Sequence, residues 1–195
     1  MAKRTGEKYD AIIEAAVRVI AKHGYHNAHV TKIAKEANVA DGTIYLYFEN
    51  KDDVLISLFQ EKMGQFVATV QENIGRRITA KEKLHELIRT HLAQLAADKD
   101  LAIVTQIELR QSNPIVREAI SETLKQYFRI IDSIVKLGIE EGVFSENIDL
   151  RMARMMIFGT LDETVTAWVM KDGKFDLLEG VDSIHSLFLS GLSGK

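Results

Sequence analysis

Residues 30 to 51 read Val30-Thr-Lys-Ile-Ala-Lys-Glu-Ala-Asn-Val-Ala-Asp-Gly-Thr-Ile-Tyr-Leu-Tyr-Phe-Glu-Asn-Lys51. Apolar residues at the start of this stretch, Ile33 and Ala37 among them, recur at helical spacing, which predicts a short helix capped by Thr31. Asn38 suits the turn that follows. The stretch therefore predicts a helix, a tight turn and a second helix, an arrangement that places a helix in the major groove of DNA.

The second helix is expected to begin near Asp41, where short residues leave little bulk at its N-terminus. Asn50 suits the cap of a third helix, whose free N–H groups and Lys51 can hold a phosphate. The candidate DNA contacts are Thr31, Lys32, Asp41, Gly42, Thr43, Tyr45, Tyr47 and Lys51. The alternative is a generic three-helix subdomain in which Tyr45 and Tyr47 merely half-bury their rings.

This stretch resembles the DNA-binding domain of the TetR repressor family. The matching motifs are Thr31-x-x-Ile-Ala-x-x-Ala-x-Val and Gly42-Thr-Ile-Tyr-x-Tyr-Phe-x-Asn-Lys51. The resemblance covers about residues 8 to 55, and the rest of the chain agrees with the family in length and outline. It implies an all-helical, two-domain, homodimeric repressor that binds a palindromic DNA operator.

Three segments resemble one subgroup of that family, the FadR-type repressors of fatty-acid degradation. They begin Asp41-Gly-Thr-Ile-Tyr-Leu-Tyr-Phe, Leu101-Ala-Ile-Val-Thr-Gln-Ile-Glu and Phe158-Gly-Thr-Leu-Asp-Glu. The resemblance implies that long-chain fatty acyl-CoA is the effector and releases the repressor from its operator. No other cofactor is implied.

The distribution of charge supports a DNA-binding end. The net charge is −3 over 195 residues, but residues 1 to 51 hold eight Lys or Arg against six Asp or Glu. The remaining residues hold 17 against 22. A basic end on an acidic body would orient the molecule with one face toward phosphate.

Composition also restricts the class of protein. The chain is 46% hydrophobic, enough for a sizeable core, and it has no cysteine for disulfides or thiolate metal ligation. The N-terminus lacks an apolar run, and no apolar stretch reaches membrane-spanning length. These features predict a cytoplasmic protein.

The remainder of the chain predicts helices and no alternating strand pattern. The expected ranges are 5–23, 50–77, 80–97, 101–112, 115–141, 150–170 and a last helix after Asp176. Thr79 and Glu82 form a capping box, Asp149 is a cap, and Gly24 and Gly142 are stops. We predict an all-α fold of nine helices, with a DNA-binding domain at 1–52 and an effector and dimerisation domain at 53–195.

The last two long helices are apolar over more than one face, which indicates a partner surface unless they form the centre of the domain's own core. The resemblance implies that they pair with their twins from a second subunit. Gly159 and Ala167 would permit close approach, and we expect a charge at Gly159 or Phe188 to yield a monomer.

Helix 101–112 holds a cation beside an apolar surface, because Gln106 and Arg110 lie four residues apart with Ile107 at their border. Arg110 is equally consistent with a salt bridge to Glu108 of a partner or to Asp162. Residues expected to line the ligand site are Phe66, Val104, Gln106, Ile107, Arg110, Tyr127, Ile131, Met155 and Phe158.

Two further classes of function compete with this interpretation. An efflux regulator that senses lipophilic cations would use acids and aromatics such as Asp162, Glu163 and Trp168. An enzyme is disfavoured, because the chain lacks a nucleophile elbow and a phosphate-binding glycine loop. His85 and His91 miss the zinc-protease spacing and are predicted to be surface residues, and no metal site is expected.

Overall fold

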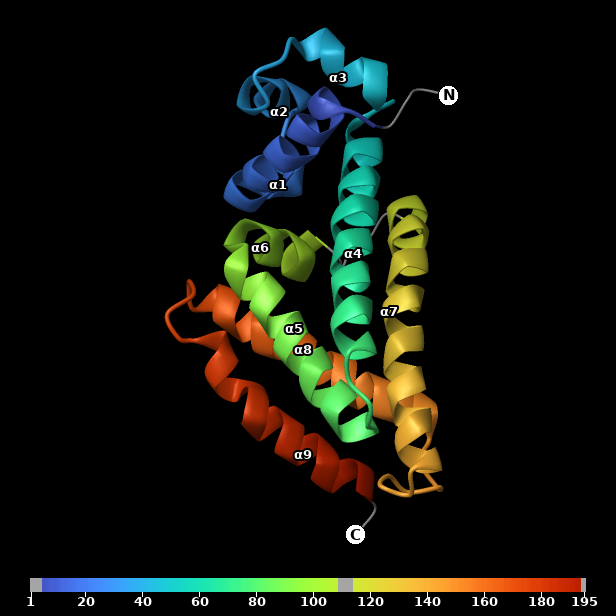
Figure 1. The fold of residues 1–195 in the computed structure, drawn as a ribbon. Helices are drawn as coiled ribbons and strands as arrows, with labels where there is room; N and C mark the ends of the chain where they lie inside the picture. Colours follow the sequence, from blue (N-terminus) through green and yellow to red (C-terminus); the bar gives the residue numbers. More distant parts are fainter. Residues whose placement is uncertain (1–4, 109–113, 194–195) are drawn as a thin grey trace. The chain divides into compact units, whose positions relative to one another are not determined.

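The computed structural model describes residues 5–108 and 114–193 of the chain (Figure 1). Within these residues every regular element is a helix, nine of them α-helices and one a short 3-10 helix. They are α1 Glu7–Asn27, α2 Val30–Glu36, α3 Asp41–Tyr47, α4 Lys51–Gly75, α5 Ala80–Ala97, α6 Lys99–Glu108, α7 Pro114–Glu140, α8 Leu150–Met170, η1 Leu177–Gly180 and α9 Val181–Ser193. The expected all-α, nine-helix fold is confirmed.

Two compact units divide the described chain. The first gathers described residues of Met1–Gly64 and Asp100–Glu122, and the second gathers those of Gln65–Lys99 and Thr123–Lys195. Helices α4 and α7 therefore each contribute to both units. The domain boundary expected after residue 52 stays a prediction.

The first unit folds around the helix-turn-helix. Asn38 adopts a left-handed backbone with φ 54°, as its place in the turn predicts. Gly24 has φ 71° and interrupts the helical path of α1, so the expected break there is confirmed. The prediction that Thr31 caps α2 is wrong: His29 is the N-cap residue, and Thr31 lies inside the first turn.

The caps of the later helices follow their local chemistry. The Thr79 side chain accepts from the Glu82 N–H and the Glu82 side chain returns the bond, which completes the predicted capping box. Asp149 accepts from the N–H groups of Arg151 and Met152. The Asp53 N–H donates to Asn50 Oδ1 over 2.9 Å at the start of α4. Helix α6 begins at Lys99, two residues earlier than expected.

The second unit packs α8 and α9 on α5, and Figure 1 shows α9 running beside α5. Apolar residues at three- and four-residue spacing form this core. Its buried members include Leu84, Leu87, Ile88, Leu92, Ile157, Leu161, Val165, Ile184, Phe188 and Leu192. No helix in the described part of the chain is long and apolar enough to cross a membrane.

Candidate functional site

The outer face of α3 presents the residues predicted to reach DNA bases. Gly42 is exposed, and a Cβ built on it would meet no atom within 4 Å. Tyr45 is 60% exposed, whereas Ile44 beside it is buried. Thr31, Lys32 and Asp41 are also exposed, and Thr43 is half-buried. One face of α3 is thus free for a ligand while the other holds the helix on its unit.

Tyr47 differs from Tyr45. Its ring centroid lies 6.2 Å from that of Tyr9 on α1 and 6.4 Å from that of Phe48. Tyr9 in turn stacks on Phe48 at 5.3 Å. The alternative in which a tyrosine merely half-buries its ring therefore holds for Tyr47, which packs α3 onto α1. It does not hold for Tyr45.

Lys51 makes contacts that its position in the motif did not reveal. Its Nζ donates to the carbonyl oxygens of Tyr25 and His26, each over 3.0 Å, and lies 4.4 Å from the Tyr25 ring centroid. The Tyr25 hydroxyl donates to Asp52 on the same turn as Lys51. Lys51 thus caps the C-terminal end of α1, and only one of the three ammonium protons is left for a phosphate.

In the second unit, three residues predicted to line the ligand site meet around a histidine. The ring centroid of Tyr127 lies 5.7 Å from that of Phe66 and 6.2 Å from that of Phe158, both in edge contacts. The His91 ring meets the Phe66 ring edge-on at 5.2 Å. Ile131 is fully buried. We call His91, Phe66, Tyr127 and Phe158 the aromatic cluster.

The prediction that His91 is a surface residue is wrong, since its side chain is only 5% exposed. Nδ1 of His91 lies 2.7 Å from the Tyr127 hydroxyl oxygen. Burial lowers the pKa of His91 to about 3 and raises that of Tyr127, so both groups are neutral at physiological pH. His91 lies on the same face of α5 as the apolar residues Leu84, Ile88 and Leu95. This helical spacing in the sequence could have predicted that His91 is buried. His85, on another face, is half-buried.

The other predicted ligand residues are dispersed. Val104 and Gln106 are buried on α6, but Ile107 is 54% exposed. Met155 on α8 is 55% exposed. Arg110 lies outside the described residues, so its predicted salt bridges to Glu108 of a partner or to Asp162 stay predictions. Ile107 and Met155 therefore line no closed cavity in the chain by itself, and their contact with a ligand stays a prediction.

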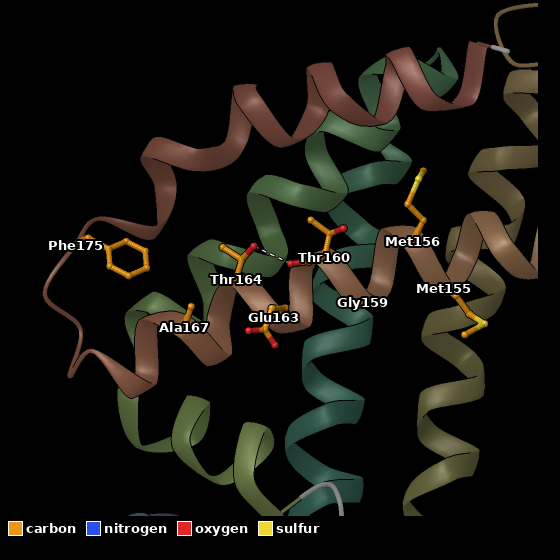
Figure 2. Close-up of a pocket in the computed structure, with 8 residues that line it drawn as sticks. All are labelled: Met155, Met156, Gly159, Thr160, Glu163, Thr164, Ala167 and Phe175. Atoms are coloured by element: carbon orange, nitrogen blue, oxygen red, sulfur yellow. Dashed lines mark hydrogen bonds between the residues drawn. The ribbon is translucent and has the colours of Figure 1, made fainter. Parts of the chain in front are cut away.

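An open groove of about 650 Å³ runs along the outer face of α8 (Figure 2). Its lining residues are Met155, Met156, Gly159, Thr160, Glu163, Thr164, Ala167 and Phe175. A Cβ on Gly159 would meet nothing within 4 Å. Phe188 is different: it is 3% exposed in the single chain, so the expectation that it faces a partner is wrong. Its ring already belongs to the chain's own core.

A buried carboxylate near the end of α4 was also missed. Glu86 on α5 accepts from Arg77 over 2.8 Å, from Arg89 and from Thr90 over 3.1 Å. Burial alone would raise its pKa, but the hydrogen bonds from Arg89, Arg77 and Thr90 outweigh it and hold the pKa at about 2. The ion pair fastens the residues after α4 to α5.

No group of three or more His, Asp or Glu in the described ranges is placed to share a metal ion.

Two family models together cover most of the chain. Residues 12–58 match the N-terminal domain of "Bacterial regulatory proteins, tetR family", and residues 59–191 match "YsiA-like protein, C-terminal region". The "Fatty acid metabolism regulator protein" of Bacillus subtilis is 56% identical over 193 residues, which is 99% of this chain and 100% of the relative.

Solved structures agree with these matches. The fatty acid degradation regulator FadR from Bacillus halodurans superposes with a TM-score of 0.90 at 58% identity, covering 94% of this chain and 99% of its own. FadR from Bacillus subtilis, in complex with stearoyl-CoA, superposes with a TM-score of 0.90 at 57% identity, covering 94% and 98%.

Proposed function

Because the chain belongs to the TetR family of bacterial transcription regulators, we propose that it represses genes of fatty-acid degradation and leaves its operator when long-chain acyl-CoA binds. The observation that carries this proposal is the likeness, over nearly the full length of both chains, to a FadR that holds stearoyl-CoA. The protein is a regulator and not an enzyme. We propose that it acts in the cytoplasm, where bacterial DNA lies.

The first step is recognition of DNA by the exposed face of α3. Gly42 allows the helix to approach base edges closely, and the exposed Tyr45 offers a hydroxyl on the same short helix. Thr31 and Lys32 would meet phosphate from α2, and the N–H groups at the start of α4 would meet another. The phosphate contacts carry no sequence information, so they hold the protein in register while α3 reads bases.

A palindromic operator requires two such helices, and the α8 groove supports a homodimer. Apolar surface on or beside α8 and α9 is exposed to water in a single chain. It comes from Met152, Met155, Leu187 and Phe175. Gly159 leaves room for a second helix to approach. An operator read in two successive major grooves requires recognition helices about 34–36 Å apart, or slightly more.

The effector site is supported by the aromatic cluster. Phe66, Tyr127 and Phe158 provide apolar surface that suits an acyl tail, and Ile131 adds to it. The multiply anionic coenzyme A head needs cations, and Arg110 is the residue proposed to meet it or the thioester, with Gln106 beside it.

The competing efflux regulator fits the described residues less well. Asp162 is buried and already has an interaction partner. The Trp168 indole N–H donates to the carbonyl oxygen of Phe175 over 2.9 Å, which fixes its ring within the chain. Glu163 alone is exposed, on the α8 groove. A lipophilic cation would therefore have to displace existing contacts.

The test is release of labelled operator DNA, measured by fluorescence anisotropy. Stearoyl-CoA should lower the anisotropy, and free coenzyme A and lipophilic cations should leave it unchanged, because differential binding alone shifts the equilibrium. Release by the cations with no response to stearoyl-CoA would replace the fatty-acid proposal by the efflux alternative.

A further inference from the structure

The aromatic cluster contains a polar atom that the chain does not satisfy. Nε2 of His91 is buried and has no hydrogen-bond partner among the residues that the structure describes. The same holds for only one other side-chain atom of those residues, Oδ1 of Asp132, whose Oδ2 accepts from Arg154. A buried polar atom without a partner is costly, so a water or a bound ligand is expected to complete its bonding.

The bond to Tyr127 decides what Nε2 offers. If the Tyr127 hydroxyl donates to Nδ1, the proton of a neutral imidazole is on Nε2, and Nε2–H is the single unpaired donor. If instead Nδ1–H donates to Tyr127, the phenolic proton has no acceptor and Nε2 has no donor, which leaves two groups unpaired. The first arrangement leaves fewer hydrogen-bonding groups of His91 and Tyr127 unpaired. We therefore assign the imidazole proton to Nε2, which makes Nε2 a hydrogen-bond donor.

The surroundings restrict the acceptor. His91 lies edge-on to Phe66, and Tyr127 lies edge-on to Phe66 and Phe158, so the donor sits among apolar rings. A free carboxylate there would be a buried charge facing one neutral donor, which is unfavourable. An uncharged carbonyl oxygen needs no counter-charge and accepts a single N–H well.

We propose that Nε2–H of His91 donates to the thioester carbonyl oxygen of the bound acyl-CoA. This inference rests on the proposed function. It adds His91 to the effector site and gives that site a preference for a thioester carbonyl. The rings of Phe66, Tyr127 and Phe158 then pack on the first methylenes of the tail, while His91 distinguishes a thioester from a carbon chain that lacks the carbonyl. His91 and Tyr127 act as a pair, because the hydroxyl fixes the proton on the nitrogen that meets the ligand.

The experiment compares two ligands that differ only at the carbonyl. Stearoyl-CoA is titrated against S-octadecyl-CoA, in which a methylene replaces the C=O, and operator release is followed by fluorescence anisotropy. Wild-type protein should need about tenfold more of the thioether for half release, the value of one buried hydrogen bond. The variant His91→Phe should respond equally to both ligands, at the concentration the thioether needs in the wild type.

The matched control is His85→Phe, which makes the same replacement on α5 at a half-buried position outside the cluster. It should keep the tenfold preference. Operator binding without ligand verifies that each variant is folded, and His91→Gln, which can place an amide N–H near the position of Nε2, should restore part of the preference if the donor is what matters.

The outcomes separate the two proposals. Equal response of wild-type protein to thioester and thioether would overturn the role of His91 and leave the acyl-CoA effector in place, whether or not His91→Phe folds. A tenfold preference that survives in His91→Phe would also overturn it. No release of wild-type protein by either ligand would overturn the proposed function itself.

Discussion

The ammonium of Lys51 lies 4.4 Å from the ring centroid of Tyr25 and donates to the Tyr25 carbonyl oxygen over 3.0 Å. The contact joins the first residue of α4 to the end of α1. Since α1 packs on α2 and α4 follows α3, Lys51 stabilises the unit that contains the helix-turn-helix even without DNA.

We therefore expect Lys51→Ala to lower the free energy of unfolding by about 1–2 kcal/mol, through lost hydrogen bonds and the lost cation–π contact. Operator affinity should fall as well, equally for specific and non-specific DNA. Urea unfolding measures the first effect and DNA titration the second. Unchanged stability would mean that the contact with Tyr25 contributes nothing.

Lys32→Ala separates phosphate binding from folding. Lys32 is exposed, and its Nζ donates to the Asn27 carbonyl oxygen over 3.2 Å. Its loss should leave stability within about 0.5 kcal/mol and reduce the salt slope of operator binding by about one unit. The salt slope is obtained from affinities at several ionic strengths. A slope equal to that of the wild type would remove Lys32 from the DNA contacts.

The dimer is tested at two positions on neighbouring helices. Gly159→Glu adds a charge to the open α8 groove, so we expect a folded monomer, because burial of an unpaired charge costs several kcal/mol. Phe188→Asp places a charge in the chain's own core and should unfold the protein instead. Light scattering and circular dichroism distinguish these results. A dimer that persists in Gly159→Glu would place the interface elsewhere.

Ionised Glu86 makes the free energy of unfolding depend on pH in the acid range. Its pKa of about 2 in the folded chain is below the ordinary value of 4.5, so its stabilising contribution is complete above about pH 4.5 and is lost as the pH falls toward 2. Glu86→Gln should therefore lower stability at pH 7 by about 2 kcal/mol, a value discounted because Arg77 and Arg89 are half exposed. The loss should shrink as the pH falls below 4.5. Urea unfolding from pH 7 to pH 3 provides the measurement.

His91 also makes stability fall with acid, but over a higher pH range than Glu86. Its folded pKa of about 3 is below the unfolded value of 6.5, so the unfolded chain takes up a proton first as the pH falls below 6.5. Wild-type protein should lose stability relative to His91→Phe by about 1.4 kcal/mol per pH unit between pH 6 and pH 4. Parallel stability curves for the two proteins would show that the folded chain protonates His91 as readily as the unfolded chain, which would contradict the lowered pKa.

Local chemistry made much of the fold predictable. Thr79, Asp149 and Asn50 bond to N–H groups within three residues of themselves, so their caps could be inferred from sequence, and Asn38 and Gly142 marked turns for steric reasons. The helical spacing located the nine helices because each must bury one apolar face.

Residues whose roles depend on distant partners were less predictable. His91 and Glu86 are polar and were not expected inside, yet Tyr127 and the arginines flanking Glu86 make their burial possible. Phe188 was assigned to a partner surface because an apolar helix does not reveal which face its own domain covers. Lys51 was recognised only as a phosphate contact, since its bonds to α1 join residues 25 and 26 positions apart.

In the proposed function, burial of an acyl tail in the chain drives release from DNA. The most direct measurement is the acyl-CoA concentration for half release of labelled operator as the tail lengthens from eight to eighteen carbons. Each buried methylene is worth about 0.8 kcal/mol, so the concentration should fall about fourfold per carbon until the site is full. A concentration that does not depend on tail length, or release by free coenzyme A at the same level, would contradict the account.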